Sequence, residues 1–182
     1  MTDFARLMSD YFVKYLAGQK GSGSNTMKTY RDTFVQLLEF MDEKKHISAD
    51  CIEVDSFSYD IINEFLEYLE KEKRVSISTR NNRLAAIRSF FKYTGYHEPK
   101  YLNISTSIRE ISKKKTEGRQ MNYLSVNAME HFLNSFDKTD HKELRCFCIV
   151  LLLYESGARV TELCNVRRYD LHLEKPYTMI LH

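Results

Sequence analysis

Apolar side chains recur every three or four residues through most of the first hundred positions, and this spacing limits the region to amphipathic helices. Only two prolines and six glycines occur in 182 residues, so few positions oppose helix formation. The spacing predicts helices over residues 3–17, 26–44, 58–72 and 76–93. We therefore expect a mainly α fold whose first domain, residues 1–100, is a four-helix bundle.

The fourth helix carries the clearest boundary signals. Ser76 or Ser78 is suited to cap its amino terminus, because a serine hydroxyl accepts a hydrogen bond from a free backbone N–H of the first turn. Its inward face is predicted to contain Leu84, Ile87 and Phe91. Gly95 then offers the backbone freedom that a helix end needs.

A second domain is predicted over residues 123–182, after a basic, weakly patterned linker at 101–122. Ser125 and Asp140 are suited to cap two helices of this domain. A break over Glu155–Ala158 precedes a short helix that opens at Arg159, and residues 177–181 have the pattern of a strand.

Charge is distributed unevenly along the chain, although the net formal charge is only +2. Residues 1–70 hold 7 Lys+Arg and 13 Asp+Glu, a net of −6, whereas residues 71–119 hold 13 and 4, a net of +9. Residues 120–182 are nearly balanced, with 7 and 8. A basic middle segment suits a polyanion such as DNA, because cations near phosphates release condensed counterions. A solvated basic face explains the same composition equally well.

Several classes of protein lack support in these residues. No apolar run approaches the length of a membrane span, and the first residues lack a secretory signal, so we expect a cytoplasmic protein. The four cysteines have no zinc-site spacing, and we expect reduced, mostly buried thiols and no metal. No P-loop or dinucleotide fingerprint occurs, so we expect neither a cofactor nor a small-molecule substrate.

Residues 153–171, Leu-Tyr-Glu-Ser-Gly-Ala-Arg-Val-Thr-Glu-Leu-Cys-Asn-Val-Arg-Arg-Tyr-Asp-Leu, resemble the first active-site box of the tyrosine recombinases, or phage-type integrases. The resemblance implies that Arg159 is the first catalytic arginine and that Glu162 orients the site. A guanidinium suits this role, since its planar fork of donors matches the oxygens of a phosphate undergoing transfer. Taken alone, Arg159 is equally a surface arginine paired with Glu155 or Glu162.

Two upstream segments resemble the core-binding domain of the same family: Asn-Thr-Met-Lys-Thr-Tyr-Arg at 25–31 with Phe34, and residues 78–91. The resemblance implies a SAM-like bundle whose second and fourth helices face DNA. On the fourth helix, Asn81, Ala85, Arg88 and Lys92 follow one stripe, which is polar and basic apart from Ala85. The full set of predicted DNA contacts, each with a solvated surface position as its alternative, is Lys28, Thr29, Arg80, Asn81, Arg83, Arg88, Lys92, Lys113, Lys114, Lys115 and Arg119.

The resemblance also implies catalytic parts that the sequence does not match: a hairpin lysine, a His-x-x-Arg box, a further His or Trp, and the tyrosine nucleophile. His172 and His182 have no arginine three residues on. We therefore expect residues 123–182 to be the truncated start of an α+β catalytic domain. The chain is expected to bind double-stranded DNA in a prokaryotic cytoplasm and to self-associate there, while remaining inactive in cleavage by itself.

Two other functions stay open at this point. One is a binding-only regulator that occupies recombination sites, and the other is a helical interaction module without a role on DNA. The residues do not specify a target sequence, nor whether the parent protein integrates a phage, moves a transposon or resolves chromosome dimers.

Overall fold

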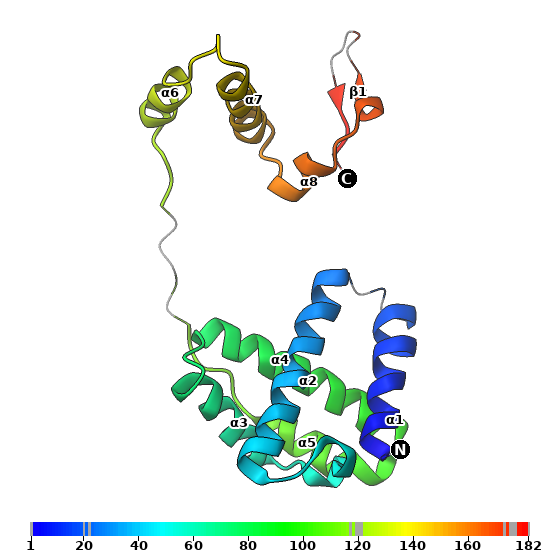
Figure 1. Cartoon of the computed structure of the whole chain (residues 1–182). Coiled ribbons are helices and arrows are strands. Elements are labelled where there is room, and N and C mark those ends of the chain that lie inside the picture. The colour runs from blue at the N-terminus through cyan, green and yellow to red at the C-terminus, as the bar shows by residue number, and fades with distance from the viewer. Residues whose placement is uncertain are drawn as a thin grey trace. The chain divides into compact units, whose positions relative to one another are not determined.

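The computed structural model describes every residue except 1, 20, 22, 117, 119–121, 173, 175–177 and 182. It divides the chain into two compact units, residues 1–118 and residues 119–182. Helices dominate the described part of both units, and the strands there lie in the second unit (Figure 1). The predicted mainly α fold class is thus confirmed.

The first unit is built from helices joined by short turns. Helix α1 (Asp3–Asp10) continues directly into a π-helical segment, η1 (Tyr11–Gln19). The other helices are α2 (Ser24–Lys45), α3 (Tyr59–Lys71), α4 (Ile77–His97) and α5 (Leu102–Glu110). Three single 3-10 turns lie between them: η2 (Ala49–Cys51), η3 (Val54–Ser56) and η4 (Pro99–Tyr101). Helix α2 crosses α4 near the centre of the unit (Figure 1).

Hydroxyl and carboxylate side chains begin three of the helices as predicted. Ser76 accepts a hydrogen bond from the backbone N–H of Thr79, at 3.2 Å, and so selects the earlier of the two possible starts for α4. Ser125 and Asp140 accept equivalent bonds at the starts of α6 (Val126–Asn134) and α7 (His141–Ser156). Each cap satisfies one of the backbone donors that a helix amino terminus leaves without a partner.

An aromatic cluster fills the core of the first unit around Phe90. Its ring centroid lies 5.2 Å from that of Phe34, 5.4 Å from that of Tyr11 and 5.5 Å from that of Phe4. These rings come from α1, η1 and α2, so one side chain of α4 joins three other segments. The predicted inward residues Leu84, Ile87 and Phe91 are also fully buried. Phe90 was not among them, because α4 is covered on more sides than a single helical stripe indicates.

The predicted linker begins too early. Residues 102–110 form helix α5, which packs on α4 and α3. Ser105, Ile108 and Ile111 are buried, so this segment completes the first core instead of leaving it. Its apolar residues are few and widely spaced in the sequence, which is why their pattern is weak.

Gly95 does not end α4, as predicted from its backbone freedom, but lies inside the helix, which continues to His97. A Cβ atom at this position would lie 2.8 Å from both Cβ and Oγ of Ser105. The absence of a side chain therefore lets the backbones of α4 and α5 approach closely.

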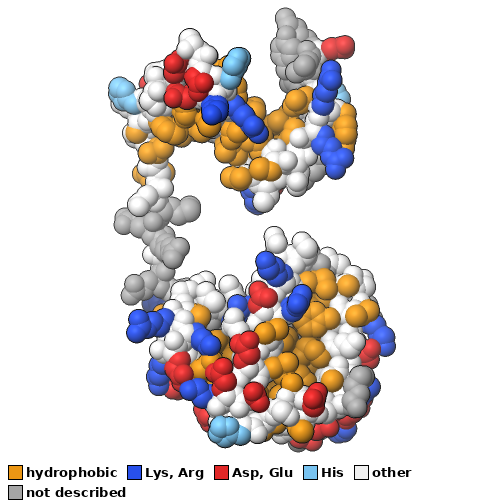
Figure 2. All heavy atoms as spheres, in the orientation of Figure 1, with side chains coloured by type: hydrophobic (Ala, Val, Ile, Leu, Met, Phe, Trp, Pro, Cys, Tyr) orange, Lys and Arg blue, Asp and Glu red, His pale blue; other side chains and the backbone are white. Residues whose placement is uncertain are grey.

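The second unit contains α6, α7, α8 (Val160–Asn165), the 3-10 turn η5 (Arg168–Asp170) and two short strands. Strands β1 (Leu171–His172) and β2 (Thr178–Met179) pair antiparallel, with Leu171 opposite Met179. None of the residues in α6, α7 or α8 is buried, and Figure 2 shows hydrophobic side chains over the surface of α6 and α7. The four cysteines are free and exposed, whereas mostly buried thiols were expected. No helix of the described residues has both the length and the apolar character needed to cross a membrane.

Gly95→Ala is expected to lower the free energy of unfolding by about 1–3 kcal/mol, because the added methyl group overpacks the α4–α5 contact. Urea denaturation of the 182-residue chain, followed by circular dichroism, measures the change. In a Ser105→Gly background the obstructing atoms are gone, and Gly95→Ala is expected to leave the free energy of unfolding unchanged. An equal loss in both backgrounds would contradict the proposed cause.

Candidate nucleic-acid interface

A groove runs between α2 and α4 and consists of two adjoining hollows. The first is lined by Asn25, Thr26, Thr29, Tyr30, Asn82 and Ala85. The second is lined by Tyr15, Tyr30, Ala85, Arg88, Ser89, Lys92 and Arg109. Because both hollows share Tyr30 and Ala85, they form one continuous surface, the α2–α4 groove. No aspartate or glutamate is among the residues that line it.

Ion pairing distinguishes this groove from several other parts of the first unit. Many cations there are neutralised by carboxylates, as in Lys44 with Glu72 at 2.9 Å and Lys14 with Asp10 at 2.7 Å. Among the described residues, no carboxylate pairs with Arg88, Lys92 or Arg109, the cations that line the groove, or with Lys28, which is exposed on α2 next to the groove residue Thr29. The positive charge of this face is therefore available to an anion.

Three of the predicted DNA contacts are exposed at the groove or beside it. Lys28 and Thr29 lie in the second turn of α2, and the Thr29 hydroxyl donates to the backbone oxygen of Asn25 at 2.9 Å. Lys92 lies on α4 with its ammonium 5.8 Å from the centroid of the Tyr96 ring. A weak cation–π contact of this kind leaves the ammonium hydrogens accessible.

Arg80 and Asn81 are engaged inside the protein. Arg80 is only 5% exposed, and its Nε donates to Oε1 of Glu70 at 3.1 Å. The Asn81 side chain donates to the backbone oxygen of Lys114 at 2.8 Å and accepts from the backbone N–H of Lys114 at 3.1 Å. A residue pinned in this way holds backbone in place, so the structure gives both a structural role that the sequence did not predict.

Arg83 and Arg88 also bind backbone oxygens. Arg83 Nη1 donates to the backbone oxygen of Thr29 at 2.8 Å, which ties α4 to α2. Arg88 Nη2 donates to the backbone oxygens of Arg109 and Ile111 at the end of α5. Charged donors form strong hydrogen bonds with carbonyls, so these contacts fix the helices that border the groove.

Segment 109–114 is held along α4 in the antiparallel direction. Arg88 binds the backbone at its start, Arg80 donates to the backbone oxygen of Ser112 at 3.2 Å, and Asn81 binds Lys114 at its end. We call this set the backbone clamp. These hydrogen bonds occupy the side chains of Arg80, Asn81 and Arg88 inside the protein. The side chains of Asn82 and Ser89, on the adjacent face of α4, reach the groove instead.

Sequence reasoning missed Asn82, Ser89 and Arg109 as groove residues. The stripe of α4 that lines the groove is Asn82, Ala85, Arg88, Ser89 and Lys92, which shares Ala85, Arg88 and Lys92 with the predicted stripe but contains Asn82 in place of Asn81. Its small and polar residues were the available signal. Nothing in the sequence indicated Arg109, because it arrives with a helix that the sequence did not predict.

The basic run at residues 113–115 overlaps the end of the clamp, and one of its three lysines is held in an ion pair. Lys114 Nζ binds Oε2 of Glu70 at 2.7 Å, whereas Lys113 and Lys115 are exposed and have no ion pair among the described residues. Arg119 lies outside the described residues. No group of three or more potential metal ligands occurs in the part of the chain that the structure describes.

In the second unit, Arg159 stands at the amino-terminal cap of α8 with its side chain 82% exposed. Its Nη1 donates to Oε1 of Glu162 at 2.6 Å, and its backbone N–H donates to Oε2 of the same carboxylate at 2.8 Å. The pKa of Glu162 is lowered, first by the backbone hydrogen bond from Arg159 and second by that from the guanidinium. One carboxylate thus orients both the start of α8 and the arginine.

Gly157 makes the turn before Arg159. It ends α7 with φ of 62°, a left-handed conformation that side chains other than glycine rarely adopt. Nothing lies within 4 Å of where its Cβ would be, so conformation and not crowding requires the glycine. The turn directs the guanidinium of Arg159 to solvent.

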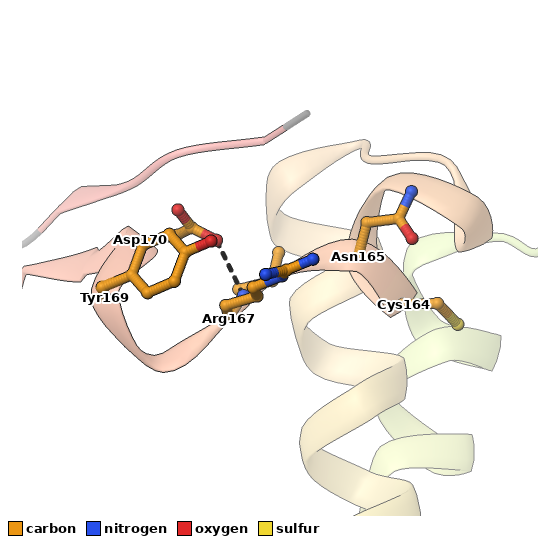
Figure 3. A pocket seen from close by; sticks show the side chains of 6 residues that line it. Cys164, Asn165, Arg167, Tyr169 and Asp170 are labelled. Carbon is orange, nitrogen blue, oxygen red and sulfur yellow. Dashed lines mark hydrogen bonds between the residues drawn. The ribbon is translucent and has the colours of Figure 1, made fainter.

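A hollow of about 620 Å³ follows α8 and is lined by Cys164, Asn165, Val166, Arg167, Tyr169 and Asp170. In Figure 3 the carboxylate of Asp170 points back to Arg167, whose backbone N–H donates to Oδ2 at 2.7 Å. The Arg167 guanidinium lies 5.9 Å from the Tyr169 ring centroid. Asp170 is only 3% exposed, so this bond shapes the turn that leads into β1.

Comparison with known proteins shows consistent similarity. Residues 10–99 match the phage integrase N-terminal SAM-like domain. The protein named as integrase/recombinase y4rC of Sinorhizobium fredii is 28% identical over 167 residues, covering 92% of this chain and 50% of that protein. Tyrosine recombinase XerC of Staphylococcus aureus is 26% identical over 166 residues, covering 90% of this chain and 52% of XerC.

A solved structure is also similar: the crystal structure of XerA recombinase matches with 24% identity and a TM-score of 0.41, over 94% of this chain and 53% of that one. The chain therefore spans about half the length of the proteins it matches.

The backbone clamp predicts different outcomes at two neighbouring asparagines. Asn81→Ala is expected to lower the free energy of unfolding by about 1–2 kcal/mol, since two hydrogen bonds to Lys114 are lost. Hydrogen exchange at the Lys114 amide is expected to accelerate. Asn82→Ala is the matched control, because Asn82 is exposed and has no hydrogen-bond partner among the described residues. Equal stability of the two variants would refute the clamp.

The pH dependence of the Arg159–Glu162 pair follows from the lowered pKa of Glu162. The pair is expected to stay intact above the ordinary glutamate value of 4.5 and to be lost as the pH falls through the lower folded value. An NMR titration of the Glu162 carboxyl measures the midpoint. Arg159→Ala removes the guanidinium but keeps the backbone N–H, so the midpoint should rise while remaining below 4.5. No change in that variant would mean that the guanidinium does not contact the carboxylate in solution.

Proposed function

Because the chain belongs to the tyrosine recombinase family and residues 10–99 form its phage integrase SAM-like domain, we propose that it binds double-stranded DNA in the α2–α4 groove during site-specific recombination. The observation that supports this most directly is the set of groove cations without carboxylate partners. DNA presents a dense row of phosphates, and its binding releases counterions for each phosphate that a cation neutralises.

The chemistry of the first hollow suits the edges of bases. Asn25 and Asn82 face it from α2 and α4, and Thr26 adds a hydroxyl. An amide side chain carries a donor and an acceptor, which matches the paired donor and acceptor of adenine in the major groove. Lys28 and Lys92 stand at or beside the groove and are proposed to contact the phosphate backbone.

The predicted contacts on α2 and α4 divide into two groups under this proposal. Lys28, Thr29 and Lys92 remain direct contacts, while Arg80, Asn81 and Arg83 position the helices from inside the protein. Arg88 belongs to both groups, since it binds the α5 backbone and also lines the second hollow. Lys113 and Lys115 are proposed to reach phosphates beyond the clamp, with Arg119 further along.

In the second unit, Arg159 is proposed to contact the phosphate at which the DNA strand is exchanged. Its exposed guanidinium and its fixed cap position suit an anion that approaches from solvent. Glu162 is proposed to keep the side chain oriented until then. In the family, the tyrosine nucleophile forms a covalent bond to that phosphate, and we propose that the 182-residue chain by itself binds DNA without forming the bond.

A gel-shift titration of the full chain with random-sequence duplex tests the proposal. Binding is expected at about 50 mM salt and should fall steeply toward 200 mM, as electrostatic DNA binding does. Lys28→Gln should weaken binding, while Lys44→Gln is the matched control. Lys44 lies in the last turn of α2, at the opposite end from the groove, and is already paired with Glu72.

Two outcomes would overturn the proposal. One is the absence of a shift at about 50 mM salt, which would favour a helical interaction module instead. The other is equal weakening by both lysine substitutions, which would place the DNA away from the groove. The same samples on a denaturing gel should contain no covalent adduct.

A further inference from the structure

The second hollow of the groove gathers positive charge from two helices. Arg88 and Lys92 come from α4, and Arg109 comes from the last turn of α5. The hollow has a volume of about 420 Å³ and no carboxylate lines it. Three like charges around one depression repel each other, so the arrangement is most stable with an anion between them.

The backbone clamp places Arg109 there. Arg88 binds the backbone oxygens of Arg109 and Ile111, so the guanidinium that lines the hollow also fixes the residue that supplies the third charge. The Arg109 side chain is exposed and has no hydrogen bond or ion pair among the described residues. Its donors are therefore free for a ligand.

Neutral donors complete the hollow. Ser89 Oγ accepts a hydrogen bond from the Tyr11 hydroxyl at 2.8 Å, which leaves the serine hydrogen free to donate. Tyr30 adds a second hydroxyl. No asparagine, aspartate or glutamate lines this hollow, so it offers mainly donors, whereas the first hollow offers amide donors and acceptors. Phosphate oxygens only accept hydrogen bonds, so a hollow that offers mainly donors suits a phosphate. The guanine edge also presents only acceptors in the major groove, so a change in sequence preference is the result that separates a base contact from a phosphate contact.

We infer that the second hollow is a seat for one phosphate of the DNA backbone, with Arg109 of α5 as a binding residue. This inference rests on the proposed DNA-binding function and assigns the two hollows separate tasks. The phosphate seat sets the position of the duplex, and the Asn25–Asn82 hollow faces the bases. Helix α5 thereby becomes part of the DNA interface as well as of the core.

Arg109→Gln tests the seat in the full chain. The variant is expected to bind every sequence in a random duplex pool more weakly, and to reduce the salt slope of binding by about one phosphate contact, roughly 0.9. Lys92→Gln, on the other helix of the hollow, is expected to give the same result. Asn82→Ala should instead change which sequences are enriched in the bound fraction, with the salt slope unchanged. Lys44→Gln again serves as the control.

The outcomes separate the two proposals. If the unsubstituted chain binds no duplex at about 50 mM salt, the DNA-binding function itself fails. If it binds, but Arg109→Gln and Lys92→Gln keep both affinity and slope, the phosphate seat is rejected while the function stands. If either variant shifts sequence preference and leaves the slope intact, the hollow contacts bases and the inference is wrong. Circular dichroism confirms that each variant is folded.

Discussion

The first unit depends on the burial of α4, which is covered by other segments on several sides at once. Phe90 joins α1, η1 and α2 through aromatic contacts, and Gly95 allows α5 to approach the backbone closely. Buried aromatic side chains supply much of the hydrophobic free energy of a small domain. Loss of this helix would therefore remove the contacts that join α1, η1, α2 and α5 through one element.

The same helix divides its polar residues between structure and surface. Arg80, Asn81 and Arg88 bind the backbone of segment 109–114, and Arg83 binds that of α2. Arg88 in particular satisfies the carbonyl of Arg109, one of those that the end of α5 leaves without a partner inside the helix. The adjacent face, with Asn82 and Ser89, remains open and borders the groove. A change of one position along the helix thus separates a packing residue from a surface residue.

The second unit differs from the first in how exposed its side chains are. Its helices carry apolar side chains on their surfaces, and Arg159 is held by one carboxylate at an exposed cap. A single ion pair in water is weak, so the guanidinium is oriented yet easily transferred to another anion. This combination suits the proposed contact of Arg159 with a DNA phosphate.

The sequence by itself determined four helical segments of the first unit, the caps of α4, α6 and α7, and the break before α8. These features follow from local rules: periodic apolar residues, hydroxyls at helix starts, and a glycine at a left-handed turn before Arg159. Tertiary structure alone decided that residues 102–110 pack on α4, that Arg80 is buried, and that Arg109 lines the groove. The spacing of charges along one helix cannot reveal which of them a distant backbone will occupy, because that choice depends on contacts between segments far apart in the chain.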